Sequence, residues 1–146
     1  MTALQVANML GGKRVLRRTI TSDLELASAV NAGLPSGSLD YVLERVEGHI
    51  ERNEDVYRIV GSARTLQRKR SSRAALSAGE SDRLARFARI LVRAEEALGE
   101  REKALKWMSR PNRALEGKRP LVLLNSDAGT LAVERILGRI EHGIFS

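Results

Sequence analysis

The spacing of the apolar residues is the feature that most restricts the fold of this chain. Apolar side chains recur at intervals of three and four positions almost throughout, and no segment alternates apolar and polar residues with a period of two. The first pattern places apolar side chains on one face of an α-helix, whereas a half-buried strand needs the second. The sequence therefore predicts an all-α fold. With 146 residues, 42% of them apolar, the helices can bury a core without disulfide or metal support.

Capping residues and helix breakers predict where the helices begin and end. Ser22 with Glu25, and Ser77 with Glu80, have the spacing of a capping box. The predicted helices cover approximately residues 22–31, 38–47, 53–60, 63–70, 78–98, 100–110, 121–124 and 126–142. Residues 1–20 carry no comparable pattern, so we expect a flexible arm there.

The same periodicity predicts which side chains face the core. In the helix 22–31 these are Leu24, Ala27 and Val30, and in the next helix Leu39, Val42, Leu43 and Val46. In the long helix 78–98 they are Leu84, Phe87, Leu91, Ala94 and Leu98, with Arg83, Arg86, Arg89 and Arg93 on the other side. In the last helix they are Ala128, Ala132, Val133, Ile136, Leu137 and Ile140.

The positive charge is concentrated in one stretch. Residues 61–93 contain nine Lys and Arg against two Asp and Glu, a net charge of +7 that equals the net charge of the whole chain. A local basic block of this kind indicates a polyanionic partner more strongly than a diffuse high isoelectric point does.

Two short helices that meet at Gly61 lie at the start of this stretch and have the spacing of a helix-turn-helix. Val56, Ile59, Ala63 and Leu66 can face inward and hold the pair together. The second helix then presents side chains that read bases or bind phosphates: Ser62, Arg64, Thr65, Gln67, Arg68 and Arg70. These six residues are the predicted DNA-binding set, and the alternative is a basic surface that faces only solvent.

Catalysis is not predicted. The chain has no cysteine, and its two histidines, His49 and His142, lack metal-ligand spacing. Gly11, Gly12 and Lys13 lack the spacing of a phosphate loop, and no nucleophile–base pair can be assembled. We therefore expect neither enzyme activity, metal nor cofactor. No apolar run is long enough to span a membrane, and the order of charges at the N-terminus is wrong for a signal peptide, so we expect a cytoplasmic protein.

The C-terminal end is unusual because two large apolar residues, Ile144 and Phe145, follow the helix stop at Gly143. They can fold back onto the core or fill a cavity of a partner. Trp107 of the preceding helices is by its pattern a core residue.

Six segments in order resemble the Xre/MbcA/ParS antitoxin family. Residues 64–69 (RTLQRK) and 76–83 (LSAGESDR) are similar to its helix-turn-helix and the segment that follows. Residues 107–117 (WMSRPNRALEG), 119–124 (RPLVLL), 126–129 (SDAG) and 137–143 (LGRIEHG) are similar to its C-terminal toxin-binding region. The resemblance covers residues 22–146. It departs from the family at Arg119, where a small hydroxyl residue is usual, and at Ser126, where threonine is usual.

The resemblance implies a bacterial antitoxin of three parts: a dimerisation region (1–50), a helix-turn-helix DNA-binding region of the Xre/Cro type (51–99) and a toxin-binding region (100–146). It also implies a RES-domain toxin that consumes NAD as partner, neutralised when the C-terminal end of the antitoxin occludes its active site. Operator DNA, through which the family represses its own operons, is the second partner. The predicted toxin-binding residues are Trp107, Glu141, His142, Gly143, Ile144, Phe145 and Ser146.

The alternative is a stand-alone helix-turn-helix transcriptional regulator, which needs the same basic helix but no toxin. A pure scaffold protein leaves the basic block unexplained. We expect a homodimer, because operators are commonly read by symmetric dimers.

Overall fold

The computed structural model describes residues 1–50 and 53–143, and every regular element within these ranges is a helix. Along the chain they are α1 (Ala3–Met9), α2 (Gly12–Leu16), α3 (Asp23–Ala32), α4 (Ser36–Val46), α5 (Asn53–Val60), α6 (Ala63–Ser72), α7 (Ala78–Leu98), α8 (Arg101–Ser109) and α9 (Asp127–Glu141). Two 3₁₀-helices, η1 (Arg113–Leu115) and η2 (Pro120–Asn125), connect α8 to α9. The predicted all-α fold is confirmed.

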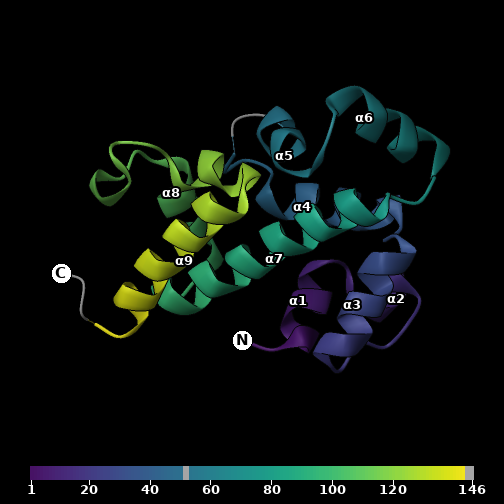
Figure 1. Ribbon diagram of the computed structural model, residues 1–146, viewed down its shortest axis with the longest axis horizontal. Helices are drawn as coiled ribbons and strands as arrows, with labels where there is room; N and C mark the ends of the chain where they lie inside the picture. Colours follow the sequence, from purple (N-terminus) through teal and green to yellow (C-terminus); the bar gives the residue numbers. More distant parts are fainter. Residues whose placement is uncertain (51–52, 144–146) are drawn as a thin grey trace.

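The long helix α7 is the centre of the molecule, and α1, α3, α5, α8 and α9 all pack on it (Figure 1). Its predicted capping box forms. Ser77 Oγ accepts a hydrogen bond from the Glu80 backbone at 3.1 Å, and the Glu80 carboxylate accepts one from the Ser77 backbone at 2.8 Å. The predicted inner face is buried except for Leu98, which is half-buried. One hydrophobic core runs continuously from α1 to α9.

Residues 1–20 are folded, so the expectation of a flexible arm is wrong. Thr2 and Gln5 form a capping box at the start of α1. Seven apolar side chains of this segment are buried: Ala3, Val6, Ala7, Met9, Leu10, Leu16 and Ile20. Gly11 allows the tight turn between α1 and α2, because its φ is 112° and a Cβ there would lie 2.5 Å from the Val15 Cβ. These two helices have only seven and five residues, which is too short for apolar spacing to identify a helix.

The inner face of α3 differs from the prediction. Leu24 is 83% exposed and Ala27 is also exposed, whereas Ala29 joins Val30 in the core and Leu26 packs against it. Apolar residues lie on more than one side of this helix, so local spacing does not select a face. Packing against α7 selects it.

The capping box predicted for α3 forms only in half. Ser22 Oγ accepts a hydrogen bond from the Glu25 backbone at 3.1 Å, as predicted. The Glu25 carboxylate, however, accepts its hydrogen bonds from the Thr21 and Ser22 hydroxyls and not from the Ser22 backbone.

The other helices begin and end within one or two residues of the predicted positions. α4 begins at Ser36, two residues before the predicted start, and buries all four predicted side chains. In α9, Ala128 is exposed, contrary to the prediction, because it lies in the first turn on the solvent side; Thr130 is buried instead. Within the described ranges, no helix is both long and apolar enough to cross a membrane.

Candidate functional site

α6 carries the exposed basic surface that the charge distribution predicted. It follows α5 after only two residues, Gly61 and Ser62. Ser62 Oγ accepts a hydrogen bond from the Thr65 backbone at 3.3 Å and so caps α6, as predicted. The side chains predicted to hold the pair together are buried, except for Ala63, which is half-buried: Val56, Ile59 and Leu66.

The six predicted DNA-binding residues do not all lie on one free surface. Ser62, Arg64, Gln67 and Arg68 are exposed, while Thr65 is half-buried. Arg64 and Arg68 are four positions apart on one helix and therefore on the same face. This face is the candidate nucleic-acid interface, and we call it the α6 surface (Ser62, Arg64, Gln67 and Arg68).

Arg70 has a structural partner that the sequence did not reveal. Its Nε donates to Asp40 Oδ1 of α4 at 2.5 Å, and its Nη1 donates to the Tyr57 hydroxyl of α5 at 2.5 Å. Burial lowers the pKa of Arg70, but these hydrogen bonds outweigh burial and raise the pKa above its ordinary value. Arg70 therefore ties α6 to α4 and α5, and it is not a free base-reading side chain.

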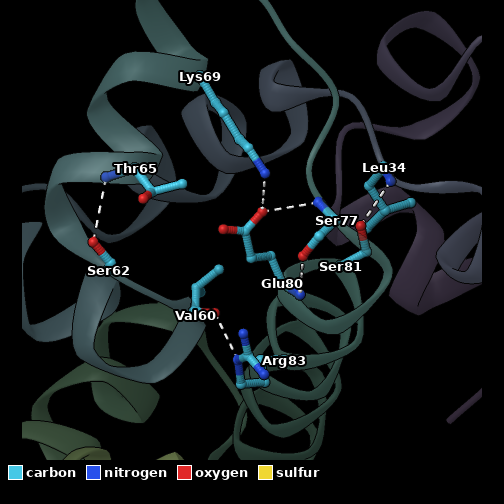
Figure 2. Close-up of polar contacts among 9 residues, drawn as sticks. All are labelled: Leu34, Val60, Ser62, Thr65, Lys69, Ser77, Glu80, Ser81 and Arg83. Carbon is cyan, nitrogen blue, oxygen red and sulfur yellow. Dashed lines mark hydrogen bonds and ion pairs between the residues drawn. The ribbon is translucent and has the colours of Figure 1, made fainter.

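A buried carboxylate positions α6 on α7 (Figure 2). Glu80 is only 7% exposed, and its Oε1 accepts from Lys69 Nζ at 2.6 Å and from the Ser77 backbone at 2.8 Å. Burial raises the pKa of Glu80, but the hydrogen bonds from Lys69 and Ser77 lower it further than burial raises it. The capping box predicted only the contact with Ser77. The Lys69 contact spans eleven positions between two helices, which local spacing does not reveal.

Two further polar contacts fix the N-terminal half of α7 against its neighbours (Figure 2). Arg83 Nε donates to the Val60 carbonyl at 2.6 Å and so satisfies the C-terminal end of α5. Ser81 Oγ accepts from the Leu34 backbone at 2.8 Å, which joins the segment between α3 and α4 to α7. The position of α6 and of its flanking helices is thus set by side chains of α7.

The other arginines of α7 lie between helices, not on an outer surface as predicted. Arg86 pairs with Asp82 at 3.1 Å and with Asp127 at 2.9 Å. Arg89 pairs with Glu134 of α9 at 3.0 Å. Arg93 lies beside Gly138 of α9, and its Nε is buried. These arginines of the basic block therefore make contacts within the protein and are not free to bind a polyanion.

The C-terminal segment from α8 to α9 packs as a helical unit on the second half of α7 (Figure 1). Trp107 is half-buried against the core, as its pattern predicted. Glu141, His142 and Gly143 are exposed at the end of α9. The other predicted toxin-binding residues, Ile144, Phe145 and Ser146, lie outside the described residues.

The joint between η2 and α9 depends on a glycine. A Cβ on Gly129 would lie 2.0 Å from the Leu123 carbonyl oxygen, so no larger residue fits there without backbone movement. Ser126 caps α9 by accepting from the Gly129 backbone at 3.0 Å, so the hydroxyl keeps its predicted role. Arg119 makes no such cap at the start of η2; it pairs with Asp55 at 3.6 Å.

The match to known proteins begins with this C-terminal unit. Residues 93–143 match the model of the antitoxin Xre/MbcA/ParS C-terminal toxin-binding domain. The all-α fold and this match define a class, the antitoxins that carry that domain.

Relatives over most of the chain narrow the class. Antitoxin Xre of Photorhabdus laumondii is 34% identical over 129 residues, which cover 86% of this chain and 84% of the relative. Antitoxin Xre of Pseudomonas putida is 33% identical over 85% of this chain and 76% of the relative. Antitoxin Xre of Yersinia enterocolitica is 39% identical over 58% of this chain and 57% of the relative. The chain belongs to the Xre antitoxin family.

Proposed function

We propose that this protein is an antitoxin that neutralises a cognate toxin by direct binding. The observation that carries the proposal is the match of residues 93–143 to a toxin-binding domain. The matched residues comprise the end of α7 and the unit from α8 to α9 that packs on it, and they end in the exposed residues Glu141, His142 and Gly143. We further propose that the protein acts in the cytoplasm as a stoichiometric inhibitor and regulator, not as an enzyme.

The proposed toxin is a RES-domain protein that consumes NAD, as the family resemblance implies. Its active site is occluded by the C-terminal end of this chain, residues 141–146. The apolar side chains of Ile144 and Phe145 are suited to a cleft, and the terminal carboxylate of Ser146 is suited to a cationic nucleotide-binding residue. Trp107 and the helices around it supply the broad contact.

Co-expression with the neighbouring open reading frame tests the antitoxin role. Growth and cellular NAD level are followed with and without this protein. Restored growth, a restored NAD level and a co-purifying complex are expected. A harmless neighbour, or a toxic one that forms no complex, contradicts the proposal.

Truncation tests the role of the C-terminal end. Deleting residues 144–146 is expected to reduce protection from the toxin more than it reduces complex formation, because the broad contact remains. A truncated chain that still protects cells fully contradicts occlusion by the tail.

We propose, in addition, that α5 and α6 act as a helix-turn-helix that binds operator DNA and represses the operon, with the protein as a homodimer. Support comes from the exposed Arg64 and Arg68 on one face of α6. Alanine at either position is expected to cost about 1–3 kcal/mol of operator binding if the arginine reads a base. Unchanged affinity and unchanged salt dependence in both variants would remove the α6 surface from the interface.

The α6 surface also favours a second candidate function, a stand-alone transcriptional regulator. This candidate predicts operator binding with no toxin encoded beside the gene. The co-expression experiment separates the two candidates, because only the antitoxin has a toxic neighbour that it silences.

A further inference from the structure

A strongly basic pocket lies where α2, the first turn of α4 and the C-terminal end of α6 meet. Its volume is about 700 Å³, and four arginines line it: Arg14, Arg17, Arg70 and Arg73. The lining contains one carboxylate, Asp40, which already pairs with Arg70. Within residues 1–50 and 53–143, the side chains of Arg14, Arg17 and Arg73 form no ion pair or hydrogen bond. Three of the four arginines that line the pocket therefore have no counter-charge among the described residues.

Two of these arginines occupy a backbone conformation that favours glycine. Arg17 ends α2 and Arg73 ends α6, each with a φ of 58°. Glycine adopts this left-handed conformation without the steric cost that a Cβ adds. Strain of this kind concentrates at functional positions, where the side chain is needed. Both residues with this conformation line the same pocket.

The first turn of α4 adds to the positive potential. Its N-cap residue, Pro35, provides no side-chain hydrogen bond to the helix, and Ser36 and Gly37 line the pocket. The N-terminal end of a helix carries partial positive charge and favours anions. The three arginines without a counter-charge remain the main source of the potential. Arginine also suits a phosphate, because it can bind two phosphate oxygens through two parallel hydrogen bonds.

We propose that this pocket binds a phosphate group, and that in the operator complex the group is a phosphodiester of the DNA backbone beside the bases that α6 reaches. α6 itself joins the two sites, because it carries Arg64 and Arg68 on its exposed face, while Arg70 in its last turn and its C-cap residue Arg73 line the pocket. A phosphate held at the end of α6 sets the register of the helix on the duplex. This assignment of DNA as the source rests on the proposed DNA binding. It gives α2 a role in DNA recognition.

The first experiment measures duplex binding by fluorescence anisotropy over a range of salt concentrations. The probes are the chain's own promoter region and an unrelated duplex of equal length. The Arg14→Gln/Arg17→Gln variant is expected to weaken binding of both duplexes by the same factor and to reduce the salt slope by about 1, because a phosphate contact carries no sequence information.

The matched control is Lys13→Gln/Arg18→Gln. It removes the same charge from the same segment, but neither residue lines the pocket. The control is expected to keep the salt slope of the unchanged protein. Equal slopes in the pocket variant and the control overturn the proposed phosphodiester contact.

A second experiment tests phosphate binding by the pocket independently of the proposed DNA binding and of any loss of folding. Inorganic phosphate is titrated into the full chain and followed by NMR shifts at residues 14–17, 36–37 and 70–73. If the unchanged protein binds neither duplex, the proposed DNA binding fails. Saturable phosphate shifts that the pocket variant loses then support the pocket as a site for a free phosphate compound, and absence of shifts overturns it.

Arg17→Gly is expected to raise the melting temperature while weakening binding, which a purely structural role of Arg17 does not predict.

Discussion

The α6 surface and the C-terminal unit are held in place by different kinds of contact. α6 is fixed to its neighbours by polar pairs, Lys69 with Glu80 and Arg70 with Asp40, and buries few apolar side chains of its own. The C-terminal unit is fixed by apolar packing: Leu121, Leu124, Val133, Ile136 and Leu137 are all buried. A helix with many cationic side chains has few positions left for apolar contact, so ionic contacts to α7 and α4 orient it.

The two regions are therefore sensitive to different kinds of change. Charge and pH act on the position of α6, because an ion pair depends on the protonation of both groups. Volume acts on the C-terminal unit, because a packed interior does not accommodate added atoms without strain. Three sets of variants test whether the two regions differ in this way.

The largest effect is expected from a single methyl group in the C-terminal unit. Gly129→Ala places its Cβ against the Leu123 carbonyl, which is backbone and cannot rotate away, so we expect a loss of about 3 kcal/mol of stability, at the upper end for overpacking. Gly138→Ala in the same helix is the matched control. Its Cβ meets only Arg93 Nη2 at 3.7 Å, so alanine is expected to stabilise the protein by about 0.5–1 kcal/mol. Denaturant unfolding measures both, and equal effects would remove the volume argument.

A smaller effect is expected at the ion pair of α6. Glu80→Gln removes the charge that Lys69 faces and is expected to cost about 1.5–2 kcal/mol of stability. The exposed pair Glu102 with Lys106 is the matched control, and Glu102→Gln is expected to cost at most about 0.5 kcal/mol. If the two substitutions have equal effects, polar contacts do not orient α6.

The pH dependence of the same variant follows from the sign of the pKa shift. Because the folded-state pKa of Glu80 is lowered, its contribution is fully present above its ordinary value of about 4.3 and is lost as pH falls through the lowered pKa. Glu80→Gln should therefore flatten the stability profile in this acid range and leave its shape at neutral pH unchanged. A profile that keeps its acid slope in the variant contradicts this assignment.

The smallest effect is expected at the helix caps, and it should be the same in both regions. Ser62 caps α6 and Ser126 caps α9 with the same backbone hydrogen bond, at 3.3 and 3.0 Å. Alanine at either position is expected to cost about 1 kcal/mol. If the two variants lose very different amounts of stability, the serine with the larger loss also supports tertiary contacts.

Helix boundaries were predictable because their signals are local. A cap joins residues three positions apart, and the apolar faces of α4 and α7 repeat within one or two turns. The exposed Arg64 and Arg68 were predictable for the same reason, since they lie opposite the buried Leu66 on one amphipathic helix. Periodicity failed at α3, where apolar residues surround the helix.

The roles of the charged residues were not predictable from local spacing. The sequence predicts surface positions for Arg70, Arg86 and Arg89, yet each pairs with a carboxylate on another helix. Arg70 pairs with Asp40, 30 positions away, and Arg89 pairs with Glu134, 45 positions away. Arg86 pairs with Asp127. The pocket around Arg14 and Arg73 likewise combines segments separated by more than fifty residues. In a sequence these arginines are indistinguishable from those that remain free.

The helical class, most helix ends and the family can be predicted from the sequence, because caps, breakers, apolar spacing and family motifs are encoded in short segments. Which cations are neutralised inside the protein, and which remain exposed, depends instead on how the helices pack. The physical reason is that a charge is satisfied by whatever group the fold brings within about 4 Å of it, at any separation along the chain.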